Sequence, residues 1–376
     1  MCEWKECVLS KVAKFGNGKR KPKSEGDIPI FGGNGILGYS SESNYDGETI
    51  IIGRVGAYSG SVYYQNKPVW VSDNALAAKP KEGNNTKFLY YFLKNMDLNQ
   101  FAGGSSHPLV TQTLLNSLEI KISNDEKEQK AIASVLSSLD DKIDLLHRQN
   151  KTLEATAETL FRQWFVEEAD EGWEEVDLDY VTQRITDGAH KSPPTVDVGL
   201  PMASVKDMHQ WGIHHDSCKK ISETDYVELV RNDCRPLKDD IIIAKDGSYL
   251  KHVFVAPNDL DLVILSSIAI LRPNGKYNPL LLSIYLKMNS TREALENIVT
   301  GAVIPRIVLK DFRKFKLTLP PMKLQIKALK TLEPIYMKCW ENVNQIYTLE
   351  KLRDTLLPKL MSGEVRAKLE QQEAGI

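Results

Sequence analysis

The stretch DEKEQKAIASVLSSLDDKIDLLHRQNKTLEATAETLFRQWF, residues 125–165, decides the fold expected for this chain. It contains neither Gly nor Pro, and its apolar residues recur at steps of three and four: Ile132, Val135, Leu139, Ile143, Leu146, Leu153, Ala157, Leu160 and Trp164. This spacing is typical of a coiled-coil helix. At ~1.5 Å per residue it makes a rod of about 60 Å. Because such a rod is too long for the interior of one small domain, it must pack on a second helix or on another protein.

A second stretch of this kind begins after Pro320 and Pro321, whose ring geometry suits a helix entrance. Its apolar positions are Leu332, Ile335, Cys339, Ile346, Leu349, Leu356 and Leu360. Pro334 lies inside it and should kink or restart the helix, because proline lacks the N–H that a helix interior needs. At the start of the first helix, Ser123, Asn124 and Asp125 are suited to cap it.

Each helix closes one copy of an internal repeat. Trp4 corresponds to Trp173, and Gln129 near the first helix start corresponds to Gln325. The run Ile50–Ile52 is followed by Arg54, Gly56 and Tyr58, and Ile241–Ile243 is followed by Lys245, Gly247 and Tyr249. Because these matches keep the same order in both copies, the chain is predicted to hold two related domains, with loops inserted in the second.

The domains are expected to be mixed and β-rich, with short β-branched runs between loops of Gly, Asn, Ser and Pro. The fold class is therefore α+β, two such domains alternating with two long helices. The predicted segments are domain 1 at 1–122, helix 1 at 123–166, a charged linker at 167–172, domain 2 at 173–320, helix 2 at 321–365 and a tail at 366–376.

Composition narrows the class of protein without naming a function. The chain has 376 residues, 48 Lys plus Arg against 50 Asp plus Glu, and 42% hydrophobic residues, which is ordinary for a folded protein. Its apolar runs are too short to span a membrane. Five scattered cysteines suit a reducing interior, so a cytoplasmic location is expected. The net charge of −2 does not by itself suggest a nucleic-acid partner.

Three patterns that can carry chemistry have simpler structural interpretations. Phe31-Gly32-Gly33-Asn34-Gly35 matches the opening of an S-adenosylmethionine site, but a glycine turn with positive φ is favoured. Glu119-Ile120-Lys121 matches part of a nuclease site and also the alternation of a half-buried strand. His214-His215 with Cys218 and Cys234 is a possible zinc cluster, and a polar loop is the simpler alternative. No catalytic residue and no metal ligand is therefore assigned.

Loops that mix bases with Tyr, Ser and His suit DNA, because Arg and Lys neutralise phosphates and short polar groups bond at base edges. The alternative for each residue is an ordinary solvated side chain. The candidates in the first copy are Lys19, Arg20, Lys21, Arg54, Tyr58, Ser105, Ser106 and His107. Those in the second copy are His190, Lys191, Lys219, Lys220, Lys245, Ser248, Tyr249, Lys251 and Arg306.

The arrangement resembles the specificity subunit of type I restriction-modification systems over about residues 3–365. The resemblance is carried by two domain exits that lead into helices, GSSHPLVTQTLLNSLEIKI before residue 123 and TGAVIPRIVLKDFRKFKLTLPPMKLQIKALKTLEPI from residue 300. The closing LLPKLMSGEV, residues 356–365, is its most specific string. The proline that enters the helix in this family is present as Pro321 before Gln325 but is missing before Gln129.

The resemblance implies that each domain recognises one half of a split double-stranded DNA target. The helices would form an antiparallel spacer and dock two modification subunits, and restriction (motor-nuclease) subunits would join that core. S-adenosylmethionine, ATP and Mg²⁺ would then be held by the partners. The chain itself would be no enzyme, would carry no cofactor and would have no membrane role.

An antiparallel pair of helices also predicts a seam and its register. The seam residues are Leu139, Ile143, Leu146, Asn150, Leu153, Ile335, Cys339, Asn342, Ile346 and Leu349. A pseudo-twofold axis near residue 148 sets Asn150 opposite Asn342, where each amide can satisfy the other. The alternative is that these asparagines face solvent.

Two other functions are compatible with the sequence. A coiled-coil protein with two β-rich domains could be a non-catalytic adaptor with no DNA role. A fused methylase-specificity protein is opposed by the missing methyl-transfer motif and by the short length.

Overall fold

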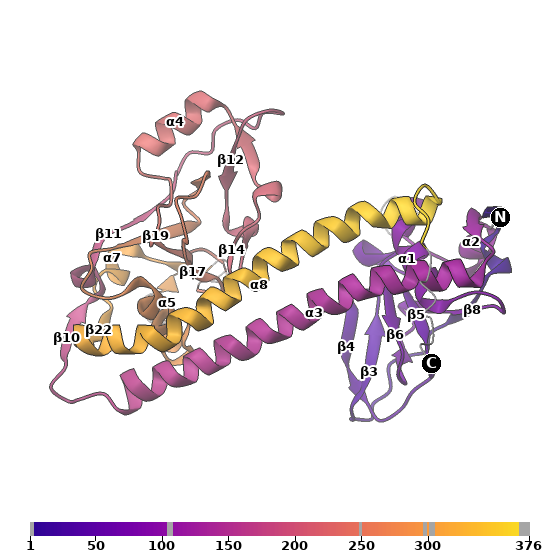
Figure 1. Cartoon of the computed structure of the whole chain (residues 1–376), viewed down its shortest axis with the longest axis horizontal. Helices are drawn as coiled ribbons and strands as arrows, with labels where there is room; N and C mark the ends of the chain where they lie inside the picture. The colour runs from indigo at the N-terminus through magenta and orange to yellow at the C-terminus, as the bar shows by residue number, and fades with distance from the viewer. Residues whose placement is uncertain (1–3, 104–107, 248–249, 296–298, 301–304, 368–376) are drawn as a thin grey trace, which may run out of the picture. The chain divides into compact units, whose positions relative to one another are not determined.

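The computed structural model describes residues 4–103, 108–247, 250–295, 299–300 and 305–367 (Figure 1). It divides into two compact units. Unit 1 comprises Met1–Leu145 with Gln345–Ile376, and unit 2 comprises Leu146–Asn344. The long helices α3 (Glu126–Arg162, continued as a π-helix over Gln163–Glu167) and α8 (Met322–Ser362) each contribute residues to both units.

Unit 1 is built on three small sheets. The four-stranded sheet has the order β2 (Ala13–Asn17), β8 (Ala75–Pro80), β5 (Thr49–Gly53) and β6 (Val62–Gln65), and all neighbours are antiparallel. A three-stranded sheet has the order β4 (Gly35–Ser40), β3 (Ile28–Gly32), β7 (Trp70–Val71), and β1 (Trp4–Val8) pairs with β9 (Glu119–Ser123). Helices α1 (Thr86–Asn95) and α2 (Gln112–Ser117) complete the unit.

Unit 2 repeats this plan. Its four-stranded sheet has the order β11 (Thr182–Asp187), β19 (Ile268–Pro273), β16 (Ile241–Ala244) and β17 (Val253–Val255). A three-stranded sheet has the order β15 (Lys219–Ile221), β12 (Leu200–Ala203), β18 (Val263–Ile264). It matches β4-β3-β7, and the pair β12–β18 is parallel like β3–β7. A two-stranded sheet pairs β10 (Glu174–Asp177) with β22 (Lys316–Leu319). The predicted α+β class and its two related domains are therefore confirmed.

Further elements of unit 2 extend the common plan. Helix α5 (Pro279–Lys287) corresponds to α1 and α7 (Leu309–Phe312) to α2. The ribbon β20 (Val299–Thr300) with β21 (Arg306–Ile307) precedes α7. The strands β13 (Met208–His209) and β14 (Gly212–Ile213), with α4 (Glu223–Arg231), lie between β12 and β16 and make the second copy longer than the first. Helix α6 (Asn289–Leu295) follows α5.

The isoleucine runs form central strands because both faces of the sheet are covered. In β5, Ile50 and Ile52 join one hydrophobic cluster and Ile51 joins another, and each is fully buried. In β16, Ile241 and Ile243 likewise point to one side and Ile242 to the other. Side chains alternate along a strand, so an uninterrupted apolar run serves two cores at once.

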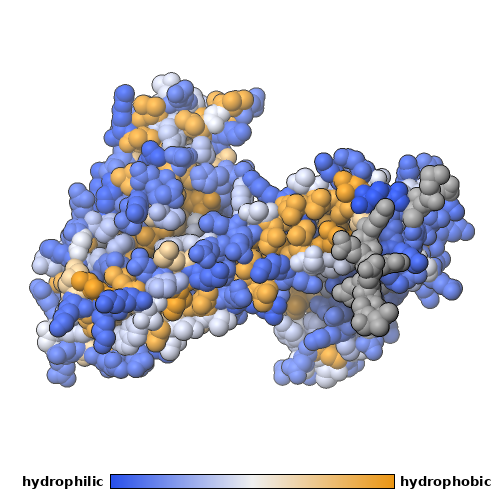
Figure 2. Space-filling view, viewed as in Figure 1, coloured by the Kyte–Doolittle hydropathy of each residue, from blue (hydrophilic) through white to orange (hydrophobic). Residues whose placement is uncertain are grey.

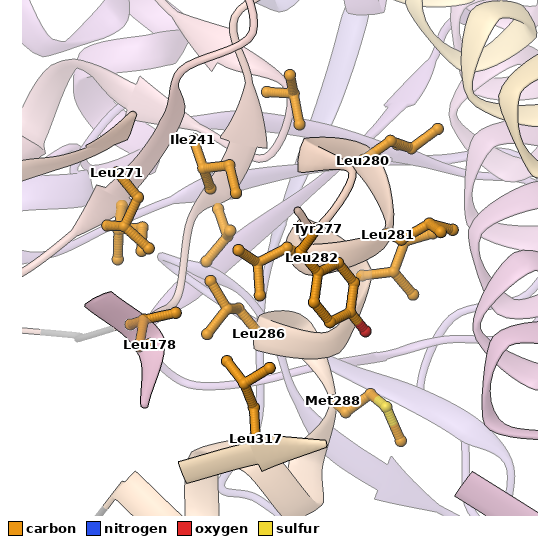
Figure 3. Close-up of a cluster of buried hydrophobic side chains, with 14 of the residues drawn as sticks. Leu178, Ile241, Leu271, Tyr277, Leu280, Leu281, Leu282, Leu286, Met288 and Leu317 are labelled. Atoms are coloured by element: carbon orange, nitrogen blue, oxygen red, sulfur yellow. The ribbon is translucent and has the colours of Figure 1, made fainter. Parts of the chain in front are cut away.

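The main core of unit 2 lies between its sheet and α5 (Figure 3). Four leucines of α5 pack there against side chains from the sheet and from the segments around β10 and β22. The leucines are Leu280, Leu281, Leu282 and Leu286, and their partners are Ile241, Leu271, Leu178 and Leu317. Tyr277 is also buried in this cluster, just before α5. Full burial of one such side chain stabilises the fold by ~1.5–3 kcal/mol.

One buried glutamine joins each long helix to its domain. Gln129 accepts a hydrogen bond at Oε1 from the N–H of Asn85 (2.8 Å) and donates from Nε2 to the carbonyl of Ser123 (2.8 Å). Gln325 does the same with the N–H of Asn278 (2.8 Å) and the carbonyl of Pro320 (2.9 Å). Asn85 and Asn278 cap α1 and α5. The match between the two glutamines in the sequence therefore corresponds to equivalent buried contacts.

Several local predictions differ from the structure. Helix α8 continues without interruption through Pro334, so the predicted restart there is wrong. Its neighbours Leu332 and Tyr336 are buried in the core of unit 2, which holds this part of the helix. Along α3, Val135 is exposed and Leu136 is buried, because this part of the helix packs on the domain core rather than along a helix seam alone.

A similar shift occurs near the end of α3. Phe161 and Phe165 are buried in the core of unit 2, whereas the predicted Leu160 and Trp164 are partly buried.

None of the helices in the described part of the chain combines the length and the apolar character that crossing a membrane requires.

Candidate nucleic-acid interface

In each four-stranded sheet, two strands end at the same edge and are followed by basic loops. Strands β2 and β5 are both antiparallel to β8, so their carboxyl ends lie together. Strands β11 and β16 have the same relation to β19. With one strand between them, the two ends are about 10 Å apart. We call these two places the basic edges of unit 1 and unit 2.

The first loop of each edge is held by the same backbone hydrogen bonds. Gly18 N–H donates to the carbonyl of Ala75 (3.2 Å), and Gly188 N–H donates to that of Ile268 (3.3 Å). The next residue donates to Val71 in unit 1 (2.9 Å) and to Ile264 in unit 2 (2.9 Å). These bonds make Asn17-Gly18-Lys19-Arg20-Lys21 equivalent to Asp187-Gly188-Ala189-His190-Lys191.

The second loop of each edge is also held in the same way. Gly56 N–H donates to the carbonyl of Pro108 (3.1 Å) and Gly247 N–H to that of Pro305 (2.8 Å), with φ of 74° and 75° at the two glycines. The carbonyl of Arg54 accepts from Val110 N–H (2.9 Å), and that of Lys245 accepts from Ile307 N–H (3.1 Å). Arg54 and Lys245 therefore hold equivalent places on the two edges.

On the basic edge of unit 1 the side chains are accessible. Lys19, Arg20 and Lys21 are exposed, and Tyr58 is half exposed in the turn Gly56–Tyr58. Arg54 is partly buried, and within the described part of the chain its Nε has no hydrogen-bond partner. The remaining candidates of this copy, Ser105, Ser106 and His107, lie outside the described residues.

On the basic edge of unit 2, three of the predicted DNA-binding residues belong to one network of charges. Lys245 Nζ lies 2.5 Å from Asp187 Oδ2, and His190 Nε2 lies 3.3 Å from Asp187 Oδ1. Asp246 receives Arg306 Nε and Nη2 at 3.0 and 3.2 Å. The Lys245 side chain is only 5% exposed, so its position differs from the exposed base that the sequence predicts.

The other candidates of unit 2 are more dispersed. Lys219 Nζ donates to Ser192 Oγ (2.6 Å) and to the carbonyl of Pro193. Lys191, Lys220 and Lys251 are exposed. Ser248 and Tyr249 lie outside the described residues.

Unit 1 also has an exposed apolar hairpin that the sequence did not predict. Its turn is the FGGNG segment, where Gly35 has φ of 82° as the turn interpretation requires. Ile36, Leu37 and Tyr39 follow in β4 and are each about half exposed. A Cβ on Gly38 would lie 3.3 Å from Lys21 Nζ, so the hairpin adjoins the basic edge. Exposed apolar residues of this kind suit contact with thymine methyl groups. Their apolar character was visible in the sequence, but their exposure was not.

The histidine and cysteine pattern does not form a metal site among the described residues, where no group of three potential ligands converges. Cys218 Sγ donates to the carbonyl of His214 (3.3 Å), and burial raises the pKa of this thiol to about 12. Glu119–Lys121 lies in β9, with Ile120 buried and its neighbours exposed, which is the alternation of a half-buried strand.

The long helices present a different surface chemistry. A hollow of about 460 Å³ in unit 1 is lined mainly by aromatic rings and by acidic residues of α3, together with one lysine and one serine. The aromatic residues are Phe31, Tyr63, Tyr64, Tyr90 and Tyr91, the acidic ones are Asp140, Asp141 and Asp144, and the other two are Lys87 and Ser137. Large apolar side chains are exposed on the helix segments of this unit, among them Val135, Leu145, Tyr347 and Leu352, and hydrophobic surface gathers over the long helices in Figure 2. Acidic and apolar surface suits protein contact better than phosphate contact.

The predicted seam residues lie on inward faces of the helices. Ile143, Leu146, Asn150, Cys339, Asn342 and Ile346 are buried, and Leu139, Leu153, Ile335 and Leu349 are partly buried. The two asparagines are 4% and 0% exposed, so neither faces solvent.

Comparison with known proteins identifies relatives over most of the chain. The family described as type I restriction modification DNA specificity domain matches residues 1–155 and 171–351. The type I restriction enzyme MjaIX specificity subunit of Methanocaldococcus jannaschii is 26% identical over 82% of this chain and 75% of that protein. The EcoprrI specificity subunit of Escherichia coli is 35% identical over 30% of this chain and 28% of that protein.

A solved structure has the same fold. The S subunit of a type I restriction-modification system from M. genitalium superposes with a TM-score of 0.63, covering 96% of both chains at 20% identity.

Proposed function

The chain belongs to the family of type I restriction-modification DNA specificity domains, and from this premise we propose that each basic edge reads one half of a bipartite DNA target. As a specificity subunit it serves target recognition within a restriction-modification complex. It is not catalytic, because the catalytic activities of these complexes lie on partner subunits. The alternative of an adaptor without a DNA role is not favoured.

The observation that carries this proposal is the equivalence of the two edges. Both collect basic residues at the carboxyl ends of two strands, and both hold their loops by the same backbone hydrogen bonds. Bases at such an edge neutralise phosphates and fix the register on the duplex, while neighbouring Tyr and polar side chains reach base edges. Two related edges with different side chains suit two half-sites of different sequence.

The long helices are proposed to pair antiparallel as a coiled-coil spacer about a pseudo-twofold axis. We further propose that their acidic and apolar surface docks two modification subunits, with restriction subunits joining that core. S-adenosylmethionine, ATP and Mg²⁺ are then bound by these partners. The exposed apolar side chains on α3 and α8 support this, because large exposed apolar patches mark protein interfaces.

The test is reconstitution with a modification (methyltransferase) subunit from the same host. The purified chain should transfer no methyl group from S-adenosylmethionine to DNA, and the complex should methylate adenine at one bipartite sequence. Methylation-sensitive sequencing of a host that carries both proteins identifies that sequence. Methyl transfer by the lone chain, or transfer by the complex without sequence preference, would contradict the proposal.

A further inference from the structure

The equivalent bases Arg54 and Lys245 have different surroundings. Lys245 is enclosed by two carboxylates, with its Nζ 2.5 Å from Asp187 and 4.0 Å from Asp246. The residues equivalent to those aspartates in unit 1 are Asn17 and Val55, neither of which carries a charge. The copy with lysine at this place therefore has two aspartates beside it, whereas the copy with arginine has two uncharged residues.

The state of each base follows from this difference. Lys245 is buried, and its charge is neutralised inside the protein. A buried ammonium without its carboxylate, or the carboxylate without the ammonium, would be strongly unfavourable. Arg54 has no carboxylate at the equivalent places, and its buried Nε has no hydrogen-bond partner among the described residues. Because the residue is partly exposed, its guanidinium can bind an acceptor from outside the protein.

The network around Lys245 also holds two accessible bases. Asp187 uses one oxygen for Lys245 and the other for His190, which is 79% exposed. Asp246 binds two nitrogens of Arg306, which is 58% exposed. Lys245 therefore lies between the two carboxylates that hold these side chains and fixes the position of those carboxylates. In unit 1 the residue equivalent to Arg306 is Leu109, so the equivalent ion pair cannot form on that edge.

We propose that the two equivalent bases have different roles: Arg54 contacts DNA directly, whereas Lys245 is a positioning residue that orients His190 and Arg306 for contact. This rests on the proposed function and assigns the contacts within it. The edge of unit 1 therefore reads DNA through Arg54 with Lys19, Arg20 and Lys21. The edge of unit 2 reads it through residues around Lys245.

The experiment compares Arg54→Met, Lys245→Met and the double variant Lys245→Met/Asp187→Asn, each in the full chain bound to the modification subunit. The double variant gives unit 2 the uncharged residue that unit 1 has at this place. Binding is measured by fluorescence anisotropy on a duplex with the target sequence and on duplexes with either half-site scrambled, and the melting temperature of the chain is measured in parallel. Lys316→Met is the control, because Lys316 is an exposed base of the same unit that pairs with Asp177 away from the edge.

We expect Arg54→Met to weaken binding by about fivefold or more with an unchanged melting temperature. Lys245→Met should lower both the affinity and the melting temperature, since it leaves the partly buried carboxylate of Asp187 without its ammonium partner. Adding Asp187→Asn should restore the melting temperature, because no unpaired carboxylate remains. It should also restore most of the affinity without the lysine, because an amide oxygen at this place can still accept a hydrogen bond from His190. The control should change neither.

Two results would overturn the division of roles. One is a Lys245→Met variant that binds weakly but melts normally and is not rescued by Asp187→Asn, which would make Lys245 a direct contact. The other is an Arg54→Met variant that lowers the melting temperature or binds DNA normally. If the unaltered complex binds no DNA while the Lys245→Met variant still melts low and is rescued, the proposed function fails and the ion-pair assignment stands.

Discussion

Asn342 donates a hydrogen bond from Nδ2 to Oδ1 of Asn150 over 2.8 Å, inside unit 2. Asn150 in turn donates from its own Nδ2 to the carbonyl of Cys339 (3.1 Å). The two side chains come from α8 and α3 and are both buried. Asn342 Oδ1 is buried and has no hydrogen-bond partner among the described residues. The contact still favours the register in which the two asparagines meet, because other registers would lose both of these hydrogen bonds.

Replacing one asparagine should therefore cost more than replacing both. Asn342→Leu leaves the side-chain oxygen Oδ1 of Asn150 without a donor. We therefore expect a loss of ~1–3 kcal/mol in the free energy of unfolding. The variant Asn150→Leu/Asn342→Leu removes both polar groups and should recover much of that loss. Urea unfolding of the four proteins of the double-mutant cycle measures the coupling. Additive effects of the two substitutions would show that the pair does not act as a unit.

The glutamine at the start of each long helix should also be needed for stability. Gln325→Ala removes the acceptor of the Asn278 N–H and a donor to the Pro320 carbonyl in a buried place. We expect a loss of ~1–3 kcal/mol in unfolding free energy. Gln163→Ala is the matched control, because the Gln163 side chain is exposed and donates to the exposed carboxylate of Glu168. Equal effects of the two substitutions would contradict a special role for Gln325.

These two features differ in how far the sequence predicts them. The helical period shows that Asn150 and Asn342 lie among apolar positions, and a symmetry argument pairs them. The match of Gln129 with Gln325 is also visible in the sequence. Their bonds to Asn85 and Asn278 are not, because those depend on where α1 and α5 start relative to the long helices. Long periodic elements are therefore predictable, whereas contacts between distant segments need the fold.

The basic edges show the same limit. The match of Arg54 with Lys245 follows from the sequence, but the burial of Lys245 does not, because Asp187 is distant in the chain and reaches it only through the order of β11, β19 and β16. Local pattern places both bases after a strand. Only the sheet order decides which of them meets a carboxylate.

Unit 2 should lose stability as the pH falls. Burial and the nearby rings of His214 and His252 lower the pKa of His209 to about 4, and burial also lowers that of His252. The unfolded chain therefore binds more protons than the folded chain between about pH 4 and pH 6.5, so stability decreases as the pH falls through that window. His209→Gln should flatten the dependence of the melting temperature on pH there. A slope equal to that of the unaltered chain would exclude His209 as its source.

The glycine of the first edge loop should tolerate no side chain. A Cβ on Gly18 would lie 1.7 Å from the carbonyl oxygen of Ser72, so Gly18→Ala must displace Lys19 and its neighbours from the edge. We expect a loss of ~1–3 kcal/mol in unfolding free energy and weaker binding of one half-site only. Gly103→Ala serves as control, because a Cβ there meets no atom of the described residues within 4 Å. Loss of both half-sites to the same degree would show that the effect is not local to this edge.

The length of the long helices should set the unread gap between the two half-sites. Insertions between Leu145 and Leu146 in α3 and between Asn344 and Gln345 in α8 fall where the chain divides into its two units, so the contacts within each unit, including the Asn150–Asn342 bond, are kept. Four residues in each helix add about one turn, or ~6 Å, which corresponds to roughly one to two base pairs of B-DNA. We expect the methylated sequence to keep both half-sites and to widen only the gap between them. Methylation-sensitive sequencing of hosts that carry either the unaltered chain or the chain with both insertions gives the gap directly. Insertion in α3 alone is the control, since it makes the two helices unequal in length and should reduce methylation. An unchanged gap in the doubly inserted chain would mean that the helices do not act as the spacer.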